Sequence, residues 1–105
     1  MSVNKVILVG NLGADPDNRG AVTKMRIATS DRRKVGDEWV DHTEWHNVAC
    51  FGRTAENVAK FCRKGKQVYI EGKIRTSKYQ DRDGNDRWAT EVVADNVRFL
   101  GSRDE

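Results

Sequence analysis

Most of the large aliphatic residues in this chain are β-branched: valine and isoleucine together number 16, against three leucines. Branching at Cβ stiffens the side chain and suits a pleated surface, so this composition favours strands over helices. The 105 residues fit one domain with one modest core. We therefore expect a single, mostly β domain.

Runs of β-prone residues separated by turn signals predict five strands. They cover residues 3–12, 22–30, 43–51, 67–79 and 88–100. Residues 13–20 are rich in turn formers, and Asp83-Gly84 predicts a hairpin turn between the last two strands. The charged stretch 31–41 suits a long exposed hairpin or loop, and Gly72 is expected to mark a bend in the fourth strand.

One helix is predicted between the third and fourth strands. Its apolar residues recur at i, i+3, i+4 and i+7, and they are Ala55, Val58, Ala59 and Cys62. Thr54 is expected to cap the helix, with Glu56 in its first turn, and Lys60, Arg63 and Lys64 in its last turn before a left-handed Gly65.

This order of elements predicts an all-β fold with one helix. Five strands with a helix between the third and fourth are typical of an OB-fold, a partly open five-stranded Greek-key barrel. We expect this domain to cover residues 1–101 and residues 102–105 to form a short C-terminal stub.

The net charge of +3 is unevenly distributed. Residues 1–52 carry seven basic and seven acidic side chains, whereas residues 60–78 carry seven basic side chains and one acid, Glu71. A local balance of +6 is typical of a surface that binds a polyanion, although a solvated face that keeps a protein soluble has the same charge.

Aromatic and basic residues alternate onto shared faces of two predicted strands. In the third strand Trp45 and Phe51 share one face, while His46 lies on the other. In the fourth strand an apolar face of Val68, Ile70, Gly72 and Ile74 lies opposite a face with Lys73, Arg75 and Tyr79. Rings that receive bases, next to cations that follow phosphates, form a stacking surface for single-stranded nucleic acid.

The charged stretch 31–41 adds to this predicted nucleic-acid surface, and one alternative role of the aromatic residues stays open. Trp39, with Arg33 beside it in the charged stretch, adds an exposed ring and a cation. The alternative is that the aromatics are core or subunit-contact residues, because aromatics are common in both settings.

Other chemistry has weak support in the sequence. His42, Glu44 and His46 share a strand face, but without a further Cys or His cluster they make a poor metal site. No glycine-rich phosphate loop and no nucleophile with its base are recognisable, so we expect no metal, no cofactor and no enzymatic activity. Two cysteines twelve positions apart are expected to be buried, reduced thiols.

Short motifs then occur in one order along nearly the whole chain: VNKVILVGNLG at 3–13, ATS at 28–30, TEWH at 43–46, FG at 51–52, RKG at 63–65, QVYIEG at 67–72, RT at 75–76 with Lys78, and TEVV at 90–93. In these motifs the sequence resembles the bacterial single-stranded DNA-binding protein family. The resemblance implies an OB-fold that binds single-stranded DNA without sequence preference. It also implies a cytoplasmic, nucleoid-associated homotetramer that protects DNA in replication, recombination and repair.

The resemblance also assigns roles to individual residues. It implies stacking by Trp45, Phe51 and Tyr79, and a subunit contact at His46. Together with the charge pattern it yields a predicted phosphate-binding set: Arg33, Arg53, Lys64, Lys73, Arg75 and Lys78.

This chain departs from the family pattern at several places. Arg33 stands where many members have another stacking aromatic, and Asn47 and Ser77 stand where many have arginine. Family members usually continue into a long tail whose acidic tip recruits replication and repair proteins. We expect the chain to be either the DNA-binding core of a longer protein or a tailless member.

Two other functions remain open from the sequence. One is a tailless dimeric OB accessory protein of the primosome, which the short length of the chain favours. The other is an RNA-binding OB domain, which would prefer RNA over DNA of the same sequence.

Overall fold

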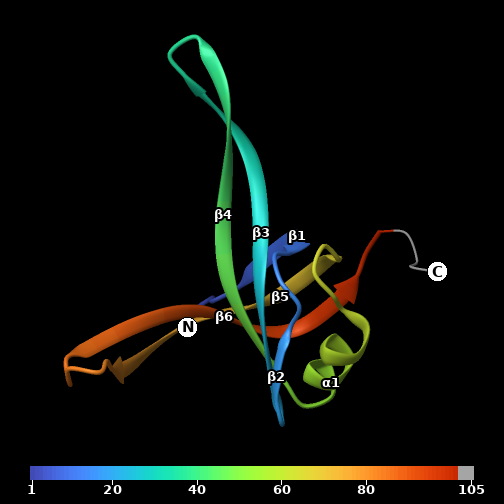
Figure 1. Ribbon diagram of the computed structural model, residues 1–105, viewed down its shortest axis with the longest axis vertical. Coiled ribbons are helices and arrows are strands. Elements are labelled where there is room, and N and C mark those ends of the chain that lie inside the picture. Colours follow the sequence, from blue (N-terminus) through green and yellow to red (C-terminus); the bar gives the residue numbers. More distant parts are fainter. Residues whose placement is uncertain (102–105) are drawn as a thin grey trace.

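The computed structural model describes residues 1–101, and the predicted stub at 102–105 lies outside them. Figure 1 shows two long hairpins projecting from a small barrel with a helix at one end. The elements are β1 (Val6–Leu12), β2 (Asp17–Arg19), β3 (Val22–Val35), β4 (Glu38–Phe51), α1 (Gly52–Phe61), β5 (Gln67–Gln80) and β6 (Asp86–Phe99).

The strands close on themselves in the order β1-β5-β6-β4-β3, and β3 pairs back to β1. Leu12 opposite Ile27 is one of the pairs that close the barrel. Among the described strands, β4 and β6 pair in parallel and the other neighbours pair antiparallel. This closed mixed barrel confirms the predicted OB-fold, and α1 lies after the third barrel strand because β2 only flanks β3.

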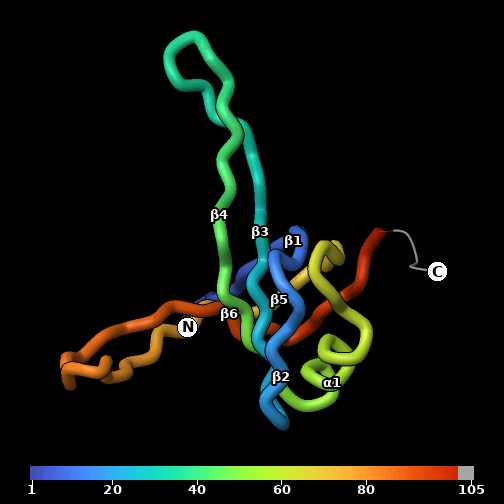
Figure 2. The backbone as a smooth tube through the Cα atoms, viewed as in Figure 1, coloured from blue at the N-terminus to red at the C-terminus, as the bar shows by residue number. Residues whose placement is uncertain are grey.

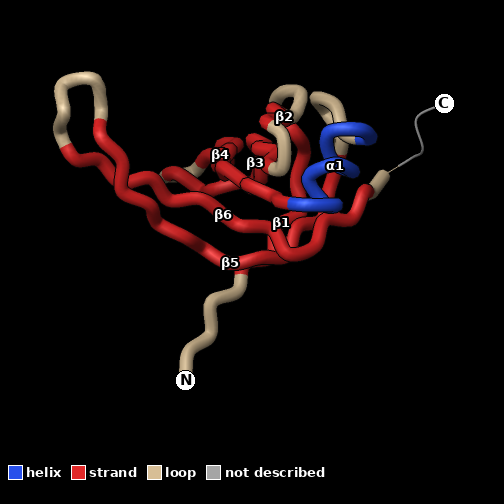
Figure 3. Tube along the Cα trace, turned by 90° about the horizontal axis from the view of Figure 1, so that it is seen from below, coloured by secondary structure: helices blue, strands red, loops and turns tan. Residues whose placement is uncertain are grey.

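The core fills the inside of the barrel and continues under α1. Every barrel strand contributes to it, because alternate residues point inward as the period of two requires. The buried cluster comprises Leu12, Met25, Ile27, Val48, Cys50, Ala55, Val58, Cys62, Val68, Ile70, Val92 and Ala94. In Figure 3 the helix covers one end of the strands, which leaves the outer faces of the long strands uncovered.

Both hairpins extend well beyond the barrel (Figure 2). β3 and β4 pair continuously from Val22–Phe51 to Val35–Glu38, so the charged stretch 31–41 is a hairpin arm rather than a loop. β5 and β6 pair out to Gln80 and Asp86, with a tight turn at the predicted Asp83-Gly84. Ile74 shares the strand face of Val68 and Ile70, as predicted, but it is half exposed rather than in the core, because β5 leaves the barrel there.

The predicted ends of the helix are also wrong. Gly52 has a positive φ of 62°, which turns the chain from β4 directly into the helix. The helix therefore starts before Thr54, its N-cap is Phe51, and Glu56 falls beyond the first turn. It ends at Phe61 with Lys60 in its last turn, as predicted, but Arg63 and Lys64 lie beyond it. Gly65 is left-handed as predicted, with a φ of 92°, but it belongs to the next turn, where its N–H donates to the carbonyl oxygen of Leu12 at 2.8 Å.

Two local features complete the fold. The predicted turn 13–20 contains the short strand β2, whose three residues pair with residues 22–24 of β3. The β5–β6 ladder shifts register between Glu71 and Gly72, at the predicted glycine, and the extra residue is Asp95 of β6. Within residues 1–101, no helix has the length and apolar character needed to cross a membrane.

The attachment of α1 to the barrel is testable at one buried hydroxyl. Thr23 is fully buried; its Oγ1 donates to the carbonyl oxygen of Ala55 at 2.8 Å and accepts from the Asn18 amide at 2.8 Å. Thr23→Val keeps the shape but removes the buried hydrogen bond to Ala55, while the exposed Asn18 amide keeps its bond to the Gly20 carbonyl at 3.2 Å. We expect it to cost about 1–3 kcal/mol of unfolding free energy in urea titrations.

The matched control is Thr76→Val. Thr76 also hydrogen-bonds through Oγ1, to Thr90 at 3.0 Å, but this pair is exposed on the β5–β6 arm. Its expected effect is about 0.5 kcal/mol or less. Equal effects of the two substitutions would contradict an anchoring role for Thr23.

Candidate nucleic-acid interface

Trp45 and Phe51 lie on the outer face of β4, as the alternation predicts. They are 46% and 42% exposed, whereas Val48 and Cys50 of the opposite face are buried. Ala49 shares the outer face but is also buried, and it pairs with Val93 of β6. The two rings are therefore held on a rigid strand whose other face is fixed in the core.

The outer face of β3 continues this surface with basic residues. Arg26 pairs with Asn47 and Lys24 pairs with Ala49, and residues paired across an antiparallel ladder point to the same side. We call the combined surface of Lys24, Arg26, Trp45, Phe51, Arg75 and Glu91 the platform. The sequence reasoning missed Lys24 and Arg26, although their alternation with buried Met25 and Ile27 is the signal that would have found them.

Trp45 is positioned by two neighbours. The Arg26 guanidinium carbon lies 4.8 Å from the centre of the Trp45 ring, a cation–π distance. On the loop after β1, a Cβ added to Gly13 would lie only 2.2 Å from Cζ3 of Trp45. The absence of a side chain at Gly13 therefore leaves room for the ring, and Arg26 places a positive charge beside it.

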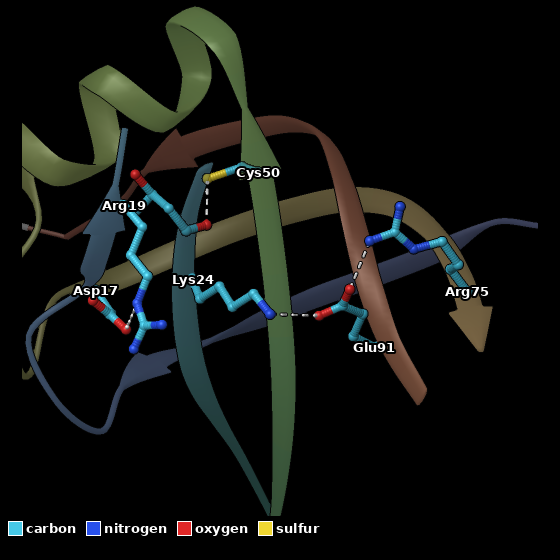
Figure 4. Close-up of polar contacts among 7 residues, drawn as sticks. Asp17, Arg19, Lys24, Cys50, Arg75 and Glu91 are labelled. Atoms are coloured by element: carbon cyan, nitrogen blue, oxygen red, sulfur yellow. Dashed lines mark hydrogen bonds and ion pairs between the residues drawn. The ribbon is translucent and has the colours of Figure 1, made fainter. Parts of the chain in front are cut away.

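Phe51 contacts Arg75 of β5, and Arg75 belongs to an ionic bridge. The Arg75 guanidinium carbon lies 5.8 Å from the centre of the Phe51 ring, and Arg75 Nη2 donates to Glu91 Oε1 at 2.7 Å. The other Glu91 oxygen lies 3.9 Å from Lys24 Nζ, so this carboxylate links cations of β3 and β5 (Figure 4). Glu91 was missed at the sequence level because only the strand order brings β6 between them.

The remaining predicted residues of β5 lie along the outgoing arm. Lys73 and Arg75 pair with Val93 and Glu91, and Tyr79 pairs with Arg87 nearer the turn, with the same alternation. Lys78 points to the opposite side and lies 3.2 Å from Asp86. The arm therefore extends the platform through Tyr79, while Lys78 is paired with a carboxylate on its other face.

The turn at the end of this arm is ordered by one carboxylate. Asp81 accepts hydrogen bonds from the backbone N–H groups of Asn85 and Asp83, at 2.9 and 3.0 Å, and from Arg87 Nε at 3.0 Å. These donors, the Asn85 backbone foremost, lower the pKa of the Asp81 carboxyl. The charged form of Asp81 thus fixes the end of the strand that carries Tyr79.

Trp39 and Arg33 lie near the far end of the β3–β4 arm, where Trp39 pairs with Lys34 and Arg33 pairs with Val40. The fold does not bring them next to Trp45, because six residues of β4 separate the two tryptophans along an extended strand. Paired residues share a side, so Trp39 lies with Lys34 on the side of Trp45, whereas Arg33 lies with Val40 on the side of His46.

Arg53 and Lys64 lie at the opposite end of the molecule. Arg53 is in the first turn of α1, and Lys64 follows the helix, where its backbone N–H donates to Asp15 Oδ1 at 2.8 Å. Lys64 lines a cavity of about 330 Å³ together with Arg63 and Lys66. The predicted phosphate-binding residues therefore form three groups, on α1 and its following loop, on the platform with β5, and on the β3–β4 arm.

The opposite face of β4 carries His46, the predicted subunit contact, and the two residues considered with it for a metal site. His46 lies there, as predicted, and its Nε2 is 2.8 Å from Thr29 Oγ1. His42 and Glu44 approach to 3.2 Å, but residues 1–101 contain no cluster of three or more His, Cys, Asp or Glu suited to a metal ion.

Cys50 and Cys62 are buried free thiols, and burial, with the neighbouring Cys62, raises the pKa of Cys50 to about 11.

The chain and its barrel match proteins of known type. The model of the single-strand binding protein family matches residues 3–100 of this chain. The chain belongs to the single-strand binding protein family. A solved structure described as the complex of Plasmodium falciparum SSB with ssDNA resembles this family member with a TM-score of 0.86 and 26% sequence identity, over 96% of this chain and 97% of that one.

Proposed function

We propose that this chain binds single-stranded DNA without sequence preference, through the platform. The observation that carries the proposal is the pair of exposed rings, Trp45 and Phe51, held on one strand face with Arg26 and Arg75 against them. Membership of the single-strand binding family and the likeness to an SSB bound to single-stranded DNA support the same function.

Stacking explains both the affinity and the lack of sequence preference. Every base has a π-face, so a ring accepts any base, and each stack contributes roughly 1–3 kcal/mol. Six residues of extended β4 separate the two rings by roughly 20 Å. A DNA strand laid along β4 then places different bases on the two rings, while cations on β3 and β5 flank the DNA strand on either side.

The arms lengthen the binding surface. Tyr79 and Lys73 continue it along β5, and Trp39 continues it along the β3–β4 arm. Arg33 and Lys78, on the other faces of the two arms, and Arg53 and Lys64, at α1 and the loop after it, add to the positive charge that attracts the strand. Affinity should therefore fall steeply as salt rises, because each neutralised phosphate releases counterions.

In the cell, this activity would coat and protect single strands during replication, recombination and repair. We propose that the protein acts as a homotetramer in the cytoplasm at the nucleoid, with His46 at a subunit contact. Binding is stoichiometric and needs no metal, cofactor or catalysis. Contacts to other replication and repair proteins through an acidic tail apply only if the parent protein has one.

The stacking role is tested by removing one ring at a time. Trp45→Ala and Phe51→Ala should each lower affinity for poly(dT) by about 1–3 kcal/mol, roughly a 5- to 150-fold rise in dissociation constant. Titration at low salt, followed by tryptophan fluorescence of the wild type and by anisotropy of labelled DNA for the variants, measures this.

The matched control is Trp88→Ala. Trp88 is also an exposed tryptophan, but it pairs with Lys78 on the side of the arm that faces away from Tyr79. We expect at most about a twofold change, the size of an ordinary surface substitution. An absence of fluorescence quenching in the wild type would sink the proposal, and tighter binding of RNA than of DNA would favour the RNA-binding alternative.

Glu91 offers a separate electrostatic test. Glu91→Gln removes the carboxylate that pairs with Arg75 and Lys24, so both cations become available to phosphates. We expect tighter binding of poly(dT) at low salt and a log–log salt slope steeper by about 0.7 for each added phosphate contact.

The control for this test is Asp37→Asn. It removes the same charge at the turn of the β3–β4 arm, far from the platform in Figure 1. Its salt slope should match that of the wild type. If both substitutions steepen the slope equally, net charge rather than the Glu91 bridge governs binding.

A further inference from the structure

A groove runs between α1 and the last residues of β6, away from the platform. Its volume is about 260 Å³, and its lining includes Arg53, Asn57, Asn96 and Phe99. Asn57 is exposed on α1, whereas Asn96 is half-buried and also borders the opposite face of β6 beside Glu71 and Arg98. Figure 3 shows α1 beside this end of the sheet.

Phe99 lines the groove, and the exposed ring of Phe61 on α1 lies beside it. The centres of the Phe61 and Phe99 rings lie 6.2 Å apart with an interplanar angle of 53°. Phe61 is 57% exposed and Phe99 is 38% exposed, and both lie outside the buried core cluster. Lys60 Nζ lies 5.4 Å from the centre of the Phe61 ring. The platform has the same combination, an exposed ring with a cation against it.

The charges of α1 and the loop after it differ from those of the platform; of these residues Arg53 lines the groove, and Arg63, Lys64 and Lys66 line the separate cavity beyond the helix. Residues 52–66 contain one acid, Glu56, and five basic residues: Arg53, Lys60, Arg63, Lys64 and Lys66. Within the described part of the chain, these five side chains take part in no salt bridge, whereas Lys24, Arg75 and Lys78 each do. Cations without a carboxylate partner bind phosphate without first breaking an ion pair.

The groove lies on the element that directly follows the platform strand in the sequence. Phe51, the last residue of β4, is the N-cap of α1, and Arg53 follows two residues later. Arg53, Asn57 and Phe61 then repeat at intervals of four, so they lie along one side of the helix. The 1.5 Å rise per residue places Arg53 and Phe61 about 12 Å apart along its axis.

We propose that this groove is a second single-stranded DNA subsite, which takes the nucleotides that leave the platform at Phe51. A base stacks on Phe61 beside Phe99, its edge meets the Asn57 amide, and Arg53 and Lys60 contact the phosphates on either side. The proposal rests on the proposed function, since it concerns the continuation of the same strand.

The test uses Phe61→Leu, which keeps an apolar side chain against Phe99 but removes the π-face. Affinity is measured by anisotropy for a short strand of about 6 thymidines and a longer one of about 16, within the range of known OB-fold site sizes. We expect about a five- to tenfold loss for the long strand, the lower end of the contribution of one base stack because leucine keeps an apolar contact, and no change for the short one. Phe61→Trp, which keeps a stacking ring, should bind the long strand as the wild type does.

Phe51→Leu serves as the matched control and should weaken binding of both strands. If the wild type binds neither strand, the proposed function fails. If the wild type binds both, Phe51→Leu weakens both and Phe61→Leu changes neither, the function stands and the groove proposal is overturned. The proposal is equally overturned if Phe61→Leu lowers the mass of the assembly in solution, because the aromatic pair is then a contact between copies of the chain.

Discussion

The parallel pairing of β4 with β6 is the contact on which the rest of the site depends. It consists of two residue pairs, Val48 with Val92 and Ala49 with Val93. These pairs join the β3–β4 hairpin to the β5–β6 hairpin, so Glu91 reaches both Lys24 and Arg75 and Arg75 reaches Phe51. Without this pairing the two hairpins would carry separate rings and separate cations. With it, four strands present one surface.

The close approach of the strands depends on small residues at the crossing. Gly72 lies at the register shift of the β5–β6 ladder, and a Cβ there would fall 2.1 Å from the carbonyl oxygen of Val93. Ala49, fully buried on the outer face of β4, pairs with the same Val93. Glycine and alanine at these two positions therefore let the strands approach closely enough to form the site.

Much of this was predictable from the sequence, for physical reasons that differ by element. Alternation placed Trp45 and Phe51 on one face of β4 and His46 on the other, because the period of a strand is fixed by its backbone. The barrel followed from the order of strands and helix. Ile74 was misplaced because alternation does not reveal where a strand leaves the core, and Thr54 was misplaced because the positive φ of Gly52 starts the helix early.

Contacts between strands distant in sequence were not predictable. Glu91 and Lys24 are 67 residues apart, and only the closed barrel brings them together. The basic stretch 60–78 likewise divides in space: Lys73 and Arg75 join the platform and its arm, whereas Lys60 and Lys64 join α1 and its loop. The charge count indicated a polyanion as ligand, and the fold separates its cations into paired and unpaired groups.

The central claim is that single-stranded DNA lies on the outer face of β4 against Trp45 and Phe51. Photo-cross-linking of thymidine strands that carry 5-iododeoxyuridine, followed by mass spectrometry of the cross-linked peptides, tests it most directly. The account predicts cross-links to the β4 peptide at Trp45 or Phe51, lost when both are replaced by leucine. Cross-links confined to the face that carries His46, with none to either ring, would contradict it.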